Sequence, residues 1–336
     1  MISGWCAPAS LDQHTFVATG VRAESPVATE ATPSFDFSAK LNEAVASKYF
    51  AGISAGLARH GDIVWTGSAG YCDVDAKRAC SPSTPMRIAS ITKPMTAVAI
   101  LQLHEKGLLD LDAPIATYLP DYPAATASKI TTRQLLHHTA GLGGYKSSKE
   151  KETVKEYRSL ADAAKVFYGR DLLFDPGSTY SYTTYGYVVL GWVLESVSGM
   201  SYERYLQKHI WGPASMDQTG VERFGRRDAT HSKLYTRSRR GRIKEAKTNN
   251  LSNRIPGGGL YSTGEDILRF GQALLDGTLL SPESLAALQS YPPVERGQNN
   301  PYGMGFFIYR EGSDEESDLG PIIGHSGAQT GASGQL

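Results

Sequence analysis

The stretch Ile88-Ala89-Ser90-Ile91-Thr92-Lys93-Pro94, followed by an apolar run to Gly107, constrains this chain more than any other. It predicts a loop that turns into a helix, which Gly107 ends. Residues three apart on a helix share a face, so the amine of Lys93 can reach the hydroxyl of Ser90. A serine becomes a good nucleophile when a neighbouring group takes its proton. Taken alone, the same tetrapeptide also fits an ordinary helix start with a serine cap and an exposed lysine.

The composition is that of a globular protein, with 336 residues of which 40% are apolar and 20% charged. Lys+Arg and Asp+Glu both number 34, so the overall charge indicates neither a nucleic-acid partner nor an anionic membrane. The densest basic run, residues 237–244, is interpreted as a charged hairpin tip. No apolar run is long enough to span a membrane. The N-terminus shows no secretory signal, so the compartment stays unknown.

The three cysteines, Cys6, Cys72 and Cys80, lack the spacing of a zinc site. Cys72 and Cys80 flank a turn-like segment and could pair in an oxidising compartment. Two separate thiols explain the same spacing. The pair His137-His138 suggests a metal, but no carboxylate or cysteine completes a site, so neither a metal nor a cofactor is expected.

The order of the predicted elements indicates one α/β (α+β) domain. Residues 1–34 are interpreted as a disordered lead-in and 35–336 as the domain. Strands at 53–59 and 63–71, joined by His60-Gly61-Asp62, and strands at 303–309 and 321–327 enclose a helix-rich middle. Helices are expected at 35–49, 90–106, 131–138, 150–168, 185–197, 202–210, 264–275 and 282–289, and a small hairpin at 234–246. This pattern predicts an antiparallel sheet flanked by helices, with a sheet-bearing part (35–107 and 300–336) and an inserted, mainly helical part (108–299).

Three short motifs follow one another along the chain. They are Ser90-Ile91-Thr92-Lys93, Tyr182-Thr183-Thr184 and His325-Ser326-Gly327. Each is weak by itself: Tyr182 lies among several tyrosines that fit a packed patch, and His325 fits a structural histidine. Together and in this order they are much more specific.

The set resembles the penicillin-recognising serine hydrolases, namely class C β-lactamases, low-molecular-weight D,D-peptidases and esterases of the same fold. The resemblance runs from about residue 37 to the last residue. Supporting stretches are 87–90, 135–142, Pro176-Gly177 and 256–263. Within the group the chain is most similar to LACTB-like active-site serine proteins. That resemblance favours a periplasmic or secreted location and allows a mitochondrial one.

The resemblance also implies roles for individual residues. Ser90 attacks a carbonyl, Lys93 assists its deprotonation, and Tyr182, with phenolate character held by Lys93 and His325, passes the proton to the leaving group. The N–H groups of Ser90 and Ala328 form an oxyanion hole worth on the order of 3 kcal/mol per donor. The remaining substrate-binding residues are Thr184, His325, Ser326 and Gly327.

Two motif positions depart from the usual family pattern. Thr184 stands where asparagine is usual; its hydroxyl can hydrogen-bond Lys93, but it has no amide to hold a substrate. His325 replaces a lysine and can be neutral near pH 7, so it clamps a substrate carboxylate less firmly than a fixed cation. Both changes favour neutral ester or longer peptide substrates over β-lactams.

The C-terminal end departs from the family as well. In the related fold, two further strands and a helix follow the third motif and lie between it and the N-terminal hairpin. Here they are expected to be missing, so the domain is expected to be truncated and the His325 strand to lack its neighbours, with buried backbone groups unpaired.

The sequence therefore predicts a serine acyl hydrolase that forms an acyl-enzyme at Ser90, most simply a peptidase or esterase with a small-molecule or peptide substrate. A true class C-like β-lactamase is the first alternative. A non-catalytic structural or filament-forming member of the fold is the alternative from another class. Oligomers are possible.

Overall fold

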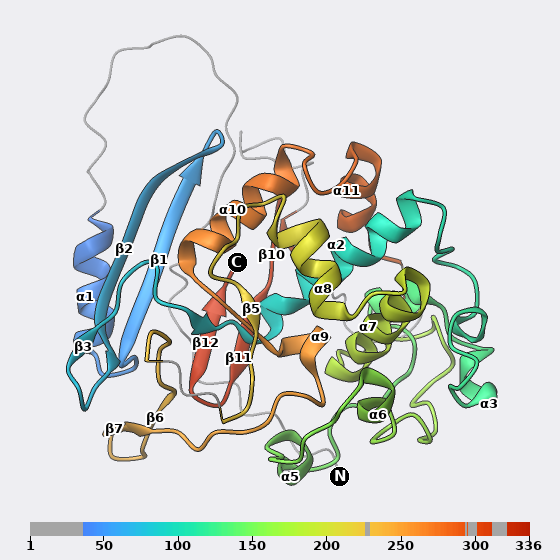
Figure 1. Cartoon of the computed structure of the whole chain (residues 1–336), viewed down its shortest axis with the longest axis horizontal. Helices are drawn as coiled ribbons and strands as arrows, with labels where there is room; N and C mark the ends of the chain where they lie inside the picture. Colours follow the sequence, from blue (N-terminus) through green and yellow to red (C-terminus); the bar gives the residue numbers. More distant parts are fainter. Residues whose placement is uncertain (1–35, 226–228, 293, 295–300, 311–320) are drawn as a thin grey trace.

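A computed structural model describes residues 36–225, 229–292, 294, 301–310 and 321–336. The chain enters through α1 (Phe37–Ala46), which Asp36 caps by accepting a hydrogen bond from the Ala39 N–H. The hairpin of β1 (Gly52–Arg59) and β2 (Asp62–Asp73) follows, with the short β3 (Arg78–Ala79) beside β2. This antiparallel sheet stands at one side of the molecule, with α1 on its outer face (Figure 1). The predicted first helix and hairpin are confirmed.

The core of the molecule forms around α2 (Thr92–Glu105), in which every residue from Thr92 to Leu103 is buried. It packs against α7 (Thr184–Ser198), the apolar helix that the sequence predicts at 185–197, and against α9 (Ile255–Gly258). Because neither α2 nor α7 has a polar face, each must be covered on all sides. Helix α7 ends at Gly199, whose φ of 66° is the left-handed conformation that glycine adopts readily.

Shorter helices cover this core. The predicted helix at 131–138 is present as α4 (Thr132–Leu136), with Thr131 and Gln134 forming a capping box. The predictions at 202–210, 264–275 and 282–289 are confirmed as α8 (Tyr202–Leu206) with the π-helix η3 (Gln207–Trp211), α10 (Gly264–Leu275) and α11 (Pro282–Gln289). The remaining short helices are η1 (Ala89–Ile91), η2 (Ile115–Thr117), α3 (Ala124–Ala127), α5 (Ser148–Lys151) and α6 (Leu160–Ala164).

The prediction of one long helix at 150–168 is wrong. Only α5 and α6 are helical there, and the chain between them is irregular. Glu150 at α5 pairs with Arg170 and the Asn249 amide donates to Glu152, so these charges hold loops together. A segment whose side chains reach outward to other loops has no apolar stripe on which a helix could pack.

In the described ranges, four small sheets complete the fold. The strands β4 (Met86–Arg87), β8 (Leu260–Ser262) and β5 (Gly220–Val221) form one that the sequence did not predict, and β6 (Tyr235–Arg237) with β7 (Ile243–Glu245) forms the predicted hairpin. The two C-terminal pairs are β9 (Phe307–Arg310) with β10 (Ile322–Gly324), and β11 (Ser326–Gln329) with β12 (Ala332–Gln335).

The expectation that the His325 strand lacks a neighbour is wrong on one side. β12 folds back along β11, and the backbones of His325 and Leu336 exchange two hydrogen bonds of 3.0 Å. Within the described ranges no strand joins β12 to β1, and the two sheets stay separate. The division into a sheet-bearing and a mainly helical part stays a prediction.

Cys72 and Cys80 form a disulfide, which decides between the two readings of their spacing. Both cysteines are buried, and the Cys72 carbonyl accepts a hydrogen bond from the Lys233 N–H. The bond therefore ties the end of β2 to β3 and supports the chain that leads to the β6–β7 hairpin.

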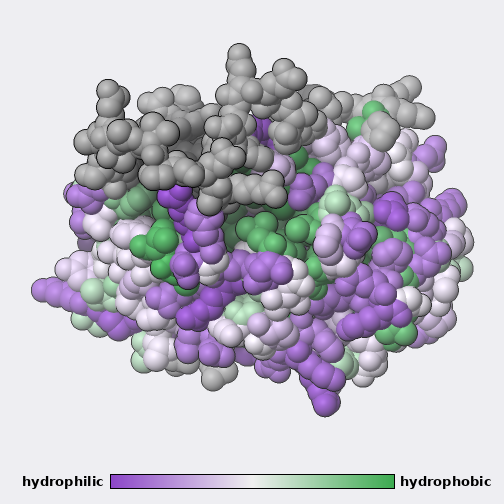
Figure 2. Space-filling model, turned by 90° about the horizontal axis from the view of Figure 1, so that it is seen from above, coloured by the Kyte–Doolittle hydropathy of each residue, from purple (hydrophilic) through white to green (hydrophobic). Residues whose placement is uncertain are grey.

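On the face that Figure 2 shows from above, many of the described residues are hydrophilic, and hydrophobic residues gather near its middle. In the part of the chain that the structure describes, no helix is long and apolar enough to cross a membrane.

We expect the double substitution Cys72→Ala/Cys80→Ala to lower the free energy of unfolding by about 2–3 kcal/mol, because the bond closes a short loop in the unfolded chain. Urea denaturation under oxidising conditions measures the change. Adding a reductant should destabilise the wild type by the same amount and leave the double variant unaffected. Equal stability of the two proteins without reductant would contradict the prediction.

Candidate active site

The backbone before Ser90 turns sharply. Ala89 has a φ of 51°, an uncommon left-handed conformation for a residue with a side chain, and it is completely buried. This turn carries the chain from β4 into η1 and then into α2. It presents Ser90 at the start of the buried helix, and such strained positions persist only where the surrounding packing enforces them.

Lys93 reaches Ser90 as its spacing predicts. Its Nζ lies 3.0 Å from Ser90 Oγ and 2.6 Å from the carbonyl oxygen of Gly257. The side chain is fully buried between α2 and α9. Burial first, and the positive charge of Arg254 second, hold the pKa of Lys93 well below its usual value. This shift favours the uncharged amine, the form that can accept the hydroxyl proton of Ser90.

Tyr182 comes just before α7, where Thr183 is the N-cap. The Lys93 Nζ lies 4.8 Å from the centroid of the Tyr182 ring. Tyr182 exposes 38% of its surface, yet its hydroxyl lies against Ser90. Burial raises the pKa of Tyr182, and the hydrogen bond with Ser90 offsets only part of the rise. The resting tyrosine therefore keeps its proton, in contrast to the phenolate character expected from the family resemblance.

The third motif lies beside the Ser90 turn. A Cβ on Gly327 would lie 2.4 Å from the Ile88 carbonyl oxygen and 3.2 Å from the Ser90 nitrogen, so only glycine fits there. Since His325 and Leu336 form a hydrogen-bonded pair, the alternation along β11 turns the Ala328 N–H away from β12. This orientation is compatible with an oxyanion hole formed by Ser90 and Ala328, which stays a prediction.

His325 faces inward. It is 1% exposed, its Nδ1 donates to the Ser326 carbonyl, and its Nε2 therefore accepts from the Tyr302 hydroxyl at 3.1 Å. Burial, together with the charge of Lys93, lowers the pKa of His325 to about 3. A buried neutral imidazole offers no positive charge to a substrate carboxylate. The expected clamp by His325, less firm than that of a lysine, is therefore not formed in this orientation. Ser326, next along the strand, has an exposed side chain.

Thr184 makes no hydrogen bond to Lys93, although its sequence position suggests one. Lys93 bonds Gly257 instead, and a Cβ on Gly257 would lie 2.6 Å from the Thr184 methyl group. Thr184 thus packs against the turn that supplies the carbonyl.

Two residues at the site carry no motif signal in the sequence. Arg254 is 1% exposed; it donates to the Tyr145 hydroxyl at 3.0 Å and to the Lys151 carbonyl, and among the described residues its Nε has no hydrogen-bond partner. Gln329 donates to the Gly258 carbonyl at 2.7 Å and so joins β11 to α9. The glycine run beginning at Gly257 hinted at close packing, but nothing distinguished Arg254 from the other basic residues.

His138 lies within the aromatic cluster below Tyr182. Its ring centroid is 4.3 Å from that of Tyr182 and 4.7 Å from that of Tyr302. Burial and the nearby charge of Lys93 hold the pKa of His138 well below its usual value. The ring therefore acts as a neutral packing element, and no group of three potential metal ligands occurs within the described ranges.

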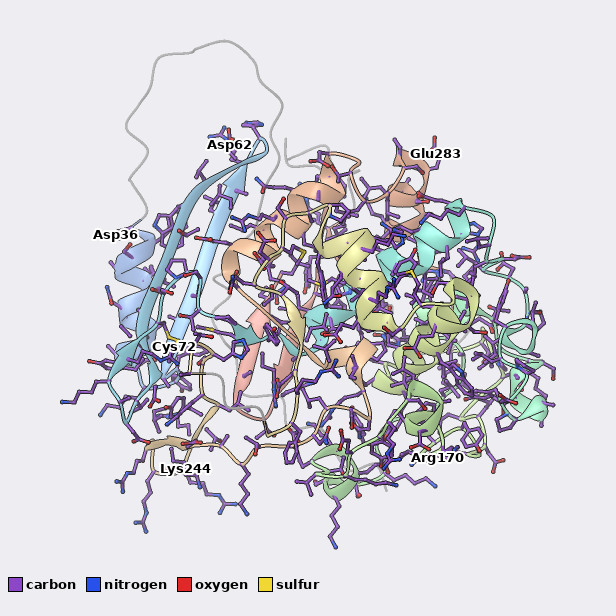
Figure 3. The ribbon with its side chains drawn as sticks, viewed as in Figure 1. Asp36, Asp62, Cys72, Arg170, Lys244 and Glu283 are labelled. Atoms are coloured by element: carbon purple, nitrogen blue, oxygen red, sulfur yellow. A yellow bond between two sulfur atoms is a disulfide. The ribbon has the colours of Figure 1, made fainter. Side chains whose placement is uncertain are left out.

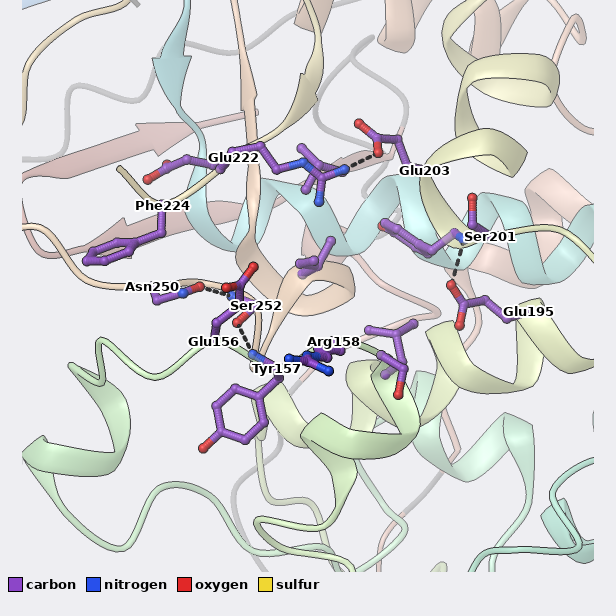
Figure 4. Close-up of a pocket in the computed structure, with 16 residues that line it drawn as sticks. Glu156, Tyr157, Arg158, Glu195, Ser201, Glu203, Glu222, Phe224, Asn250 and Ser252 are labelled. Carbon is purple, nitrogen blue, oxygen red and sulfur yellow. Dashed lines mark hydrogen bonds and ion pairs between the residues drawn. The ribbon is translucent and has the colours of Figure 1, made fainter. Parts of the chain in front are cut away.

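A cavity of about 500 Å³ lies between α6, α8 and β5, separate from Ser90 (Figure 4). Glu195 accepts from the Tyr202 N–H at its wall, and Glu203 pairs with Arg223. Ile255 of α9 also lines it, two residues before the carbonyl that holds Lys93. None of the three motifs contributes to this cavity.

Comparisons with known proteins agree with this geometry. The Beta-lactamase family model matches residues 37–336. The chain belongs to this family. A putative penicillin-binding protein, PbpX of Bacillus subtilis, is 31% identical over 76% of this chain and 61% of its own length. The human mitochondrial serine beta-lactamase-like protein LACTB is 28% identical over 67% of this chain and 53% of its own. The chain thus spans little more than half of these relatives.

Solved structures show the same fold. A penicillin-binding protein from Bacillus halodurans superposes with a TM-score of 0.74 at 26% identity, over 90% of both chains. A D-amino acid amidase from Ochrobactrum anthropi SV3 gives a TM-score of 0.74 at 25% identity, over 88% of this chain and 84% of that one. The predicted family and fold class are confirmed.

We expect Gly327→Ala to lower the rate of acyl transfer to Ser90 by about 10²–10³-fold, because the added methyl group pushes β11 away from the Ser90 N–H. Stopped-flow or mass-spectrometric acylation measures the rate. Gly144→Ala is the matched control, since no atom lies within 4 Å of its added Cβ. Similar rates for the two variants would show that the close approach of Gly327 is unimportant.

Proposed function

We propose that this chain is a serine acyl hydrolase with Ser90 as its nucleophile. One observation carries the proposal: the buried amine of Lys93 lies 3.0 Å from Ser90 Oγ in surroundings that favour its uncharged form. Lys93 takes the hydroxyl proton as Ser90 forms a bond to the substrate carbonyl carbon. The Ser90 and Ala328 N–H groups hold the oxyanion. The bond to the leaving group then breaks, Tyr182 gives the leaving group a proton, and the proton held by Lys93 replaces it on Tyr182.

Water completes the cycle by hydrolysing the ester at Ser90, which releases the acid and restores the serine. The proposed acyl donors are amides, peptides or esters. Two observations support this class over β-lactams. The similar structures include D-amino acid amidases, and His325 places no positive charge on the motif strand for a carboxylate. No cofactor enters these steps.

We also propose a compartment and an oligomeric state for this protein. The buried disulfide supports an oxidising compartment such as the periplasm or the cell exterior. Assembly into oligomers has support from a penicillin-binding protein homologue of Pyrococcus abyssi, described as octameric, with a TM-score of 0.73 at 26% identity over 88% of this chain.

We expect a fluorophosphonate probe to label the wild type once, at Ser90, and to leave Ser90→Ala unlabelled. Lys93→Met should react about 10²–10⁴ times more slowly, because the hydroxyl loses its base. Ser83→Ala, a change at an exposed serine nearby, should react like the wild type. Intact-mass measurements follow the adduct. A folded wild type that takes up no probe would favour the non-catalytic member of the fold.

We expect the preference for neutral over anionic ester substrates to stay constant from about pH 5 to pH 9. His325, with a pKa of about 3, remains neutral throughout this range. Ratios of kcat/KM for a neutral ester and its succinyl analogue measure the preference, so that titration of Lys93 cancels between the two substrates. A fall in kcat/KM for the anionic substrate alone, as the pH rises through about 6.5, would mean that His325 binds the carboxylate of that substrate.

A further inference from the structure

The β6–β7 hairpin carries a dense positive charge. Five of the eight residues from Arg237 to Lys244 are arginine or lysine, and none is acidic. All five side chains are exposed, and in the described part of the chain none of them forms an ion pair. Figure 3 shows Lys244 at the margin of the molecule, where long side chains ending in nitrogen project outward. The zero net charge of the whole chain hides this local excess.

Aromatic residues lie directly beside these cations. Tyr49 is 65% exposed, Phe50 39% and Tyr71 45%, on the α1–β1 loop and on β2. The guanidinium of Arg237 lies 4.4 Å from the centroid of the Tyr49 ring, which joins the hairpin to this aromatic group. We call the five basic residues and these three aromatic residues the hairpin patch.

A hollow of about 580 Å³ opens within the hairpin patch. Its walls are mostly apolar, and basic side chains stand at its edge. The lining comprises Val45, Lys48, Phe50, Ala51, Tyr71, Val74, Arg240, Gly241, Arg242 and Ile243. Positive charge thus borders an apolar recess.

The base of the hairpin is firmly held while its tip stays free. The Tyr235 hydroxyl accepts from the Val74 N–H at 2.7 Å, and Lys233 pairs with Asp73 at 3.1 Å. The acidic groups near the base of the hairpin, Asp73, Asp75 and Glu245, all lie within 4.0 Å of the Lys233 amine. They pair with Lys233 and leave the charges at the hairpin tip available to a partner.

We propose that the hairpin patch docks this protein on an anionic phospholipid bilayer. Basic side chains bind the headgroups, and exposed aromatic rings settle at the boundary between headgroups and acyl chains. Sites that bind nucleic acid are typically positively charged grooves that follow the phosphate backbone, whereas these cations stand on a projecting tip. The apolar hollow has a role at a lipid surface and none on a phosphate backbone.

Vesicle co-sedimentation of the full chain tests the proposal. We expect binding to vesicles of phosphatidylcholine mixed with phosphatidylglycerol, weaker binding at high salt, and none to phosphatidylcholine alone. Because each basic residue near the surface contributes about fivefold to affinity, Arg239→Glu/Arg240→Glu should lose at least about 25-fold. Tyr49→Ala/Phe50→Ala should also weaken binding, and this loss should persist at high salt.

The matched control is Lys129→Glu/Lys208→Glu, which makes the same change in net charge at two exposed lysines outside the hairpin patch. This variant should bind as the wild type does, and thermal melts check that all variants fold. Equal loss in the control would show that net charge alone governs binding and would overturn the proposal. So would equal binding to neutral vesicles, or capture of a single-stranded oligonucleotide without capture of vesicles.

Discussion

The burial of a single amine determines much of this structure. The Lys93 side chain, in the first turn of α2, is fully buried, and its hydrogen-bond partners are the Ser90 hydroxyl and the Gly257 carbonyl. A charged amine in such a place would lose several kcal/mol of hydration. The neutral form avoids this loss, provided that the two partners are held in place. Helices α7 and α9 and the Ala89 turn hold them.

A nearby positive charge lowers the pKa of Lys93 further. A buried lysine often lies beside a carboxylate, which would restore its positive charge. Here Arg254 stands nearby, and its own partners are a tyrosine hydroxyl and a backbone carbonyl. The positive charge of Arg254 therefore adds to the effect of burial and lowers the pKa of Lys93 further, which favours the lysine as a base.

The sequence predicted those parts of the fold that depend on local pattern. The Ser90–Lys93 spacing, the apolar helix α7 and the hairpins follow from periodicity and turn residues. The prediction of one helix at 150–168 failed because the charged side chains of this segment contact residues far along the chain, such as Glu152 with Asn249. The pairing of β4 with β8 joins residues too distant for any local pattern to reveal. The role of Arg254 could not be predicted for the same reason, since its effect on the pKa of Lys93 depends on where the two side chains lie in space.

The orientation of His325 shows the same limit at the candidate active site. The motif alone suggested a group that binds substrate, but the ring is buried and Tyr302 donates to its Nε2. That contact fixes the tautomer, and the surrounding rings keep the imidazole neutral. The proton transfers of the proposed reaction then rest on Ser90, Lys93 and Tyr182. The lowered pKa of Lys93 favours the lysine as the base, and the raised pKa of Tyr182 favours the tyrosine as the acid. Acylation of Ser90 requires a base and an acid in these two places.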